Sequence, residues 1–91
     1  MPIDYSKIPY IFLSEIAEDI KQDFLGAVPG HPGYSYLHAM AQLTDIDEMY
    51  GQDSASSVIA YFLANTEDWK TEKSVKIKNY LNRLLEAHKN Q

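Results

Sequence analysis

Apolar residues recur at three- and four-residue steps along most of this chain, and that spacing puts them on one face of an α-helix. The first stripe consists of Tyr10, Leu13, Ile16, Ala17, Ile20 and Phe24. Later stripes run through residues 34–41, 55–63 and 77–85. No segment shows the sustained two-residue alternation of a strand bounded by turn residues. The spacing therefore predicts an all-α fold.

Helix-ending signals divide the chain into four or five predicted helices. Pro9 suits a first helical turn, and Gly26 suits a left-handed C-terminal cap. Thr44 and Asp53 are N-capping residue types. The predicted ranges are about 9–25, 33–43, 45–50, 54–65 and either 67–88 or 74–88. Because 91 residues is the size of one domain, we expect a single compact bundle.

The start of the last helix is ambiguous because Thr66, Thr71 and Ser74 can each serve as its N-cap. A helix unbroken from Thr66 would turn Lys70 and Lys73 onto its apolar face. Either that face of the helix no longer packs on the core at these residues, or the helix is broken between residues 66 and 74.

The chain has no cysteine, which excludes a disulfide framework, thiol catalysis and thiolate zinc sites. Its longest apolar stretches, residues 8–13 and 58–64, are far shorter than the ~20 residues that span a bilayer. No basic region precedes an apolar run near residue 1, so no secretory signal is expected. We expect a cytoplasmic protein without a membrane partner.

The stretch GAVPGHPG, residues 26–33, holds three of the four glycines and interrupts the helical pattern. Its two Pro-Gly pairs each suit a tight turn. It lacks the GxxxxGK[ST] order of a phosphate-binding loop. We therefore expect a stiff corner in which replacing His31 by Ala leaves folding nearly unchanged. The alternative is a recognition loop that uses His31 and Tyr34.

Four acidic residues crowd the segment DIDEMYGQD, namely Asp45, Asp47, Glu48 and Asp53. A calcium loop of the EF-hand type would need an acid or amide at position 49 and glycine at position 50. The chain has Met49 and Tyr50 there. We interpret the acids as favouring two helix N-termini and as a candidate acidic patch, without a metal.

Catalytic and metal-binding signatures are missing from the sequence. His31, His38 and His88 are scattered without the i, i+4 pairing of a helical metal site. The serines do not form a GxSxG motif. We therefore expect that the chain is not an enzyme and carries no cofactor.

Residues 44–65 have the outline of a helix-turn-helix, with a glycine between two predicted helices. From residue 22 to residue 69, however, the chain has no lysine or arginine. A recognition helix without cations lacks the phosphate contacts that dominate nucleic-acid affinity, so we reject this interpretation. A candidate basic patch follows, at Lys70, Lys73, Lys76 and Lys78. Because an acidic body is attached to it, we expect only weak, salt-sensitive nucleic-acid binding without sequence specificity.

Charge is distributed unevenly along the chain. Residues 1–68 contain eleven Asp and Glu against two Lys, a net charge of −9. Residues 69–91 contain six Lys and Arg against two Glu, a net charge of +4, which gives −5 for the whole chain. A surface with two signs of charge steers protein partners, including other copies of the same chain.

A candidate interface lies at the start of the first predicted helix, at Tyr10, Ile11 and Phe12. In a helix that begins near residue 9, Ile11 lies about 160° from Leu13 and so outside the apolar stripe. A homodimer seam would cover this second apolar face. The alternative is that residues 2–8 fold back over it.

These observations favour a small acidic protein-interaction module or oligomeric adaptor without catalytic activity. One alternative is an acidic inhibitor that imitates nucleic acid and occupies a basic groove on another protein. A second alternative is a small-molecule-binding or enzymatic domain.

Overall fold

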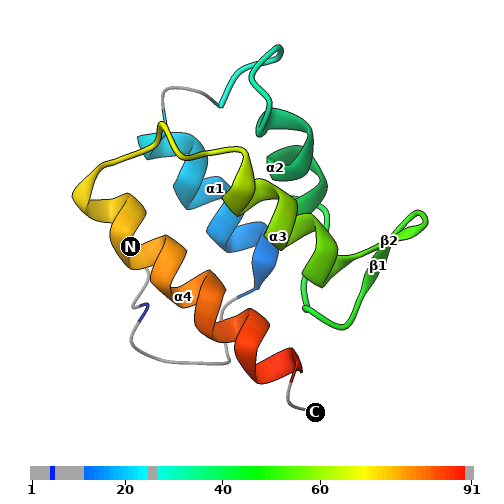
Figure 1. Ribbon diagram of the computed structural model, residues 1–91. Helices are drawn as coiled ribbons and strands as arrows, with labels where there is room; N and C mark the ends of the chain where they lie inside the picture. The colour runs from blue at the N-terminus through cyan, green and yellow to red at the C-terminus, as the bar shows by residue number, and fades with distance from the viewer. Residues whose placement is uncertain (1–4, 6–11, 25–26, 90–91) are drawn as a thin grey trace.

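The computed structural model describes residues 5, 12–24 and 27–89, and within them four α-helices and one small sheet (Figure 1). The helices are α1 (Leu13–Asp23), α2 (Tyr34–Met40), α3 (Ala55–Ala64) and α4 (Glu72–Lys89). The strands are β1 (Met49–Tyr50) and β2 (Asp53–Ser54), which pair antiparallel. The prediction of a compact, mainly helical fold is confirmed, and the small two-stranded hairpin is an element that the sequence did not predict.

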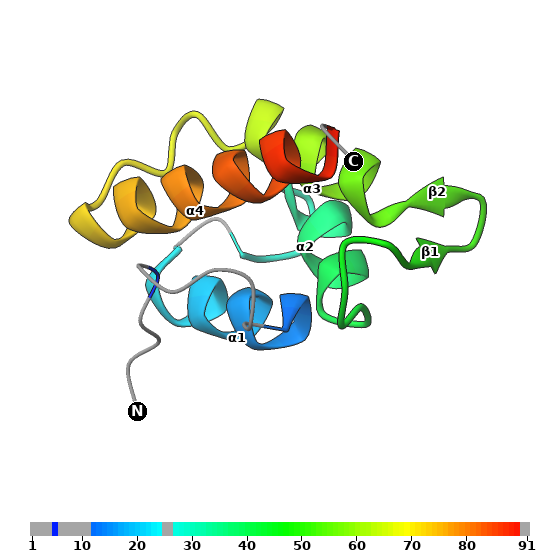
Figure 2. The same ribbon diagram turned by 90° about the horizontal axis from the view of Figure 1, so that it is seen from below.

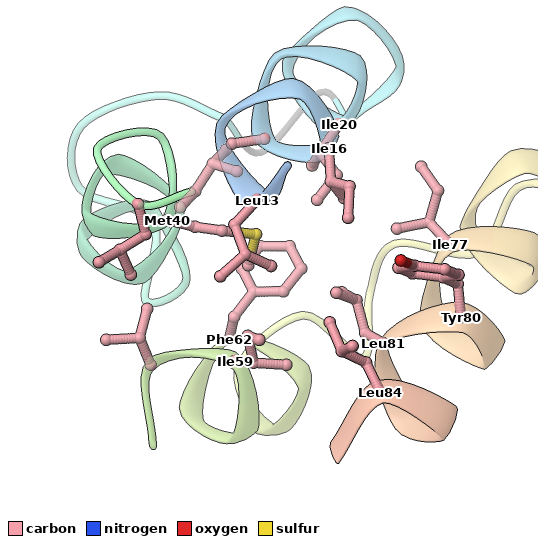
Figure 3. Close-up of a cluster of buried hydrophobic side chains, with 14 of the residues drawn as sticks. Leu13, Ile16, Ile20, Met40, Ile59, Phe62, Ile77, Tyr80, Leu81 and Leu84 are labelled. Carbon is pink, nitrogen blue, oxygen red and sulfur yellow. The ribbon is translucent and has the colours of Figure 1, made fainter. Parts of the chain in front are cut away.

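The four helices close a ring around one core. Helix α1 packs against α2 and α4, and α3 packs against the same two helices (Figure 1). Apolar side chains from all four helices meet in the centre of the ring (Figure 3). The labelled ones are Leu13, Ile16 and Ile20 from α1, Met40 from α2, Ile59 and Phe62 from α3, and Ile77, Tyr80, Leu81 and Leu84 from α4. All of them belong to the predicted stripes, so each helix turns the predicted face inward.

Helix α1 begins at Leu13 rather than near residue 9. Phe12 is its N-cap and has an extended backbone, with φ −69° and ψ 142°. The Leu13 N–H donates to the carbonyl of Thr44 at 3.0 Å, and the Ser14 N–H donates to the carbonyl of Leu43 at 2.8 Å. These bonds satisfy donors that a helix end leaves open, and they tie α1 to the loop after α2. The end signals predicted at positions 9 and 26 lie outside the described residues.

The helix predicted at 45–50 does not form. Residues 45–48 make one turn, closed by a bond from the Glu48 N–H to the carbonyl of Asp45 at 3.2 Å, and the β1–β2 hairpin follows. Gly51, which was expected to end a helix, has φ +62° and turns the chain between the strands. A six-residue helix is too short to offset its nucleation cost, and Ile46 is the one buried apolar side chain within 45–50.

The other helix ends differ from prediction by one to three residues. Helix α3 begins after Ser54 rather than after Asp53, and Ser54 Oγ accepts from the Ser57 N–H at 3.1 Å. Helix α2 ends at Met40 because the next turn tightens, with the Leu43 N–H donating to the Met40 carbonyl at 3.1 Å.

A reciprocal cap places the start of α4. The Ser74 N–H donates to Thr71 Oγ1 at 3.0 Å, and the Thr71 N–H donates to Ser74 Oγ at 2.8 Å. Thr66 is instead buried, and its hydroxyl donates to the Phe62 carbonyl at 2.8 Å. Of the two alternatives left open by the sequence, the structure shows the break between residues 66 and 74, and Lys70 lies before the helix.

The corner predicted between the first two helices is described from residue 27 onward. Gly30 has φ +101°, a conformation that favours glycine. Gly33 lies so close to the segment after α3 that an added Cβ would be 2.6 Å from Thr66 Cγ2. The absence of a side chain at Gly33 therefore lets the corner pack against that segment.

We expect Gly33→Ala to destabilise the protein by about 1–3 kcal/mol, because the new methyl group overlaps Thr66 Cγ2. Thr66→Ser removes the opposing methyl group and keeps the hydroxyl that donates to Phe62. The double variant should therefore recover much of the lost stability. Urea unfolding of the wild type and the three variants measures this coupling. Additive losses in the double variant would contradict a steric clash.

Candidate functional site

The four acids of the candidate acidic patch lie together on residues 44–54, which we call the acidic loop. The loop includes the hairpin, which projects away from the helices (Figure 2). Asp45, Asp47, Glu48 and Asp53 are all exposed. Met49, within the same loop, has 59 % of its surface exposed. The loop therefore presents an apolar side chain among acids.

Glu48 is occupied by the loop itself. Its Oε1 accepts hydrogen bonds from the N–H groups of Thr44 and Asp45, at 2.6 and 2.7 Å, and from the Thr44 hydroxyl. The hydroxyl bond is the largest cause of a lowered pKa of Glu48, followed by the backbone bonds. Glu48 therefore stabilises a turn and not the helix N-terminus predicted for these acids, since no helix forms at 45–50 and Ser54 caps α3.

The remaining acids are less constrained. Asp47 Oδ1 lies 3.2 Å from His88 Nδ1, which joins the loop to the end of α4. Asp45 Oδ1 accepts from the Asp47 N–H at 3.3 Å, and the residue is exposed. Asp53 is exposed on β2. Across residues 5, 12–24 and 27–89, no group of three or more His, Cys, Asp or Glu is placed to hold a metal ion.

The four lysines of the candidate basic patch are not gathered on one face. Lys73 and Lys76 line a cleft beside α1, whereas Lys70 and Lys78 line a different groove. Lys73 pairs with Asp19 of α1. The segment that was expected to act as one patch is thus divided, because these side chains point to different sides of the chain.

Lys78 serves the fold directly. Its Nζ donates to the carbonyls of Thr66 and Trp69 at 2.7 and 2.8 Å, and it lies 5.5 Å from the centre of the Trp69 ring. Burial lowers the pKa of Lys78, and the nearby Asp68 and Glu67 partly oppose that effect. Trp69 is itself buried with Lys78 over its ring, so the ring is not an exposed aromatic surface.

The candidate interface is described only in part. Tyr10 and Ile11 lie outside the described residues. Phe12 has 56 % of its surface exposed, but it precedes α1 instead of adding an apolar side to that helix. The predicted seam assumed that Phe12 adds an apolar side to the first helix. That assumption is wrong, because Phe12 precedes the helix.

Tyr5 lies in a site between α1 and α4, called here the Tyr5 seat, that the sequence did not predict. It is buried, and its hydroxyl donates to Asp19 Oδ2 at 2.6 Å. Its ring meets the Tyr80 ring edge-on at 5.6 Å, and Arg83 Nη2 donates to its carbonyl at 3.0 Å. Burial, followed by the bond to Asp19, raises the pKa of Tyr5, so the hydroxyl stays protonated and remains a donor. Tyr5 belongs to no apolar stripe, so no local signal marks it.

A cleft of ≈ 400 Å³ adjoins this seat, and its lining includes Asp19, Asp23 and Thr71. Asp23 Oδ2 accepts from Trp69 Nε1 at 2.9 Å and from Thr71 Oγ1 at 2.5 Å. The Thr71 bond and then the Trp69 bond lower the pKa of Asp23. A carboxylate held ionised in this way is a weak base at neutral pH. Asp23 therefore ties the end of α1 to the segment before α4 through these two bonds.

His31 anchors the corner instead of facing outward from it. Its Nδ1 accepts from the Gly33 N–H at 3.0 Å, so Nε2 carries the proton and donates to Asp68 Oδ2 at 2.9 Å. The bond to His31 is the largest cause of a lowered pKa of Asp68. The His31 ring also meets Phe24 edge-on at 4.9 Å. These contacts favour the corner over a recognition loop, and they make His31 a structural residue.

Comparison with protein-family models, with curated proteins and with solved structures finds no match to this chain. The described helices include none that is both long and apolar enough to cross a membrane.

We expect His31→Ala to lower the free energy of unfolding by about 1–2 kcal/mol, because two hydrogen bonds and a ring contact are lost. This replaces the expectation from sequence that the change is nearly neutral. His38→Ala is the matched control, since His38 is exposed. Urea unfolding at neutral pH makes the comparison, and equal effects of both changes would contradict an anchoring role.

The pKa of Asp23 predicts an acid-sensitive contribution to stability. Because that pKa is lowered by folding, the stabilisation is present above the unfolded aspartate pKa of about 3.9 and is lost as pH falls through the folded value. We expect Asp23→Asn to be less stable than the wild type at neutral pH and to lose less stability on acidification. Urea unfolding at several pH values tests this, with the exposed Asp53→Asn as control. Parallel pH profiles for Asp23→Asn and the wild type would contradict it.

Proposed function

We propose that this protein is a non-catalytic interaction module whose acidic loop docks a basic segment of a partner protein. The observation that carries the proposal is the exposed Met49, set in a projecting loop with Asp45 and Asp53 exposed around it. Interfaces commonly combine an apolar anchor with a charged rim. Methionine adapts its shape to different partners, which suits such an anchor.

Charge favours a basic occupant. The loop falls within the stretch from residue 22 to residue 69 that has no lysine or arginine. Within the described part of the chain, the loop makes one contact of this kind, between Asp47 and His88, and it is an ion pair only when His88 is protonated. Uncompensated carboxylates raise the association rate of a cationic partner, and the effect weakens as salt screens them.

The division of the lysines supports a protein partner over a nucleic acid. A phosphate backbone needs several cations on one face, and here Lys73 is paired with Asp19 while Lys78 binds backbone carbonyls. A homodimer through Tyr10, Ile11 and Phe12 stays a proposal, supported among the described residues by the exposure of Phe12. The proposed compartment is the cytoplasm, which suits a chain without cysteine.

Two charge-matched double variants test the docking surface. Asp45→Asn with Asp53→Asn removes two charges from the acidic loop, and Glu18→Gln with Glu86→Gln removes two exposed charges elsewhere. Proteins captured from source cells on the wild type are identified and then titrated against both variants. We expect the loop variant to bind a basic partner roughly five- to tenfold more weakly and the control variant to bind normally.

Other outcomes would overturn this assignment. Equal weakening in both variants would indicate a general charge effect rather than a docking loop. Displacement of the partner by duplex DNA would favour the acidic inhibitor that imitates nucleic acid. Turnover of a small molecule that depends on the Tyr5 cleft would favour the enzymatic alternative.

A further inference from the structure

Two tyrosines, Tyr36 of α2 and Tyr61 of α3, form an aromatic pair apart from the acidic loop and the Tyr5 seat. Their ring centroids lie 5.4 Å apart, and the ring planes are tilted by 31°. The two helices pack against each other (Figure 1). Tyr36 packs partly against the core, whereas 52 % of the surface of Tyr61 is exposed. The pair, called here the aromatic patch, therefore joins a fixed ring to an open one.

The aromatic patch lies in a part of the chain without positive charge. Helices α2 and α3 contain no Asp, Glu, Lys or Arg. From residue 22 to residue 69, with histidine neutral, every charged side chain is a carboxylate. In the described part of the chain, the cation found over an aromatic ring is Lys78 at Trp69, away from the patch. Because the face of an aromatic ring attracts a cation, the patch is complementary to a positively charged group.

The chemistry of two stacked rings favours arginine over lysine as that group. A guanidinium is planar, stacks flat on an aromatic face and is weakly hydrated. An ammonium is compact and strongly hydrated, so it loses more hydration when it approaches a ring. The open ring of Tyr61 therefore suits the side chain of arginine.

The aromatic patch is close along the chain to the acidic loop. Helix α3 begins directly after Ser54, the last residue of the loop. Tyr61 follows Ser54 by seven residues, a rise of about 10 Å along the helix. An extended segment covers that rise with about three residues. A segment docked on the loop therefore needs only a few further residues to reach the patch.

We propose that the aromatic patch binds arginine side chains of the basic segment that docks on the acidic loop. This inference rests on the proposed function and adds a chemical requirement, because the segment must carry arginine beside the part that the loop binds. The carboxylates of the loop attract arginine and lysine alike, and the patch distinguishes between them.

Two labelled peptides of equal length and charge test the proposal. One alternates arginine with serine, and the other alternates lysine with serine. Fluorescence anisotropy at low salt gives the dissociation constant of each peptide. We expect the wild type to bind the arginine peptide about two- to fivefold more tightly than the lysine peptide. Equal binding of the two peptides overturns the proposal.

A variant of Tyr61 assigns the preference to the aromatic patch. Tyr61→Leu keeps an apolar side chain beside Tyr36 but removes the aromatic face, so the preference for arginine should disappear. Val75→Leu is the matched control, since Val75 of α4 is exposed to a similar extent, 58 %, and this variant should keep the preference. Circular dichroism checks that both variants are folded. A folded Tyr61→Leu protein that keeps the preference overturns the proposal.

Should Tyr61→Leu fail to fold, Tyr61→Trp replaces it. An indole attracts a cation more strongly than a phenol does, so the preference for arginine should rise. An unchanged or lower preference in this variant overturns the proposal.

The loop variant, Asp45→Asn with Asp53→Asn, separates this inference from the proposed function. It should weaken the binding of both peptides by the same factor and leave the preference for arginine unchanged. Normal binding of both peptides to the loop variant overturns docking on the acidic loop. An unchanged preference in Tyr61→Leu overturns the role of the aromatic patch, so the two failures are distinguishable.

Discussion

The segment between α3 and α4, residues 65–71, contacts three distant parts of the chain. Some of these contacts are hydrogen bonds, and one is close packing. The corner reaches it through Gly33 and His31. The end of α1 reaches it through Asp23, and α4 reaches it through Lys78. The ring of helices depends on these contacts, because this segment carries the chain from α3 across to α4 (Figure 1). The polar atoms of this segment form hydrogen bonds with the side chains of His31, Asp23 and Lys78.

This use of charged groups inside the fold changes what the surface presents. The carboxylates of Asp19, Asp23 and Glu48 accept hydrogen bonds from donors within the chain. The ammonium groups of Lys73 and Lys78 bind acceptors within the chain. In the positive segment near the C-terminus, Lys73 and Lys78 are used in this way and Lys70, Lys76 and Lys89 are exposed. Much of the acidic loop also faces solvent. Net charge per segment is therefore a poor guide to the surface field, since paired charges cancel at short range.

The two proposed binding surfaces differ in kind. The acidic loop is a projecting element with an exposed methionine, which suits salt-dependent docking of a separate chain. The aromatic patch of Tyr36 and Tyr61 lies on two uncharged helices, which suits the stacking of a planar cation. The site between α1 and α4 is filled by Tyr5, whose hydroxyl donates to Asp19 and whose carbonyl accepts from Arg83. The first proposal rests on charge and exposure, and the second rests on the geometry of the ring pair.

Helical periodicity alone determined which faces enter the core, because burial of a stripe depends on spacing within one helix. Glycine and proline predicted the corner, and the capping residues left a break before α4 as one of two alternatives, since these residues act locally. Only the tertiary structure decided the hairpin at Met49–Ser54, the late start of α1 at Leu13, the separation of the lysines and the seat of Tyr5. Each of these depends on partners that the fold brings together, such as the carbonyl of Thr44 for Leu13 and the carboxylate of Asp19 for Tyr5. Local pattern cannot identify those partners, because their separation along the chain carries no periodic signal.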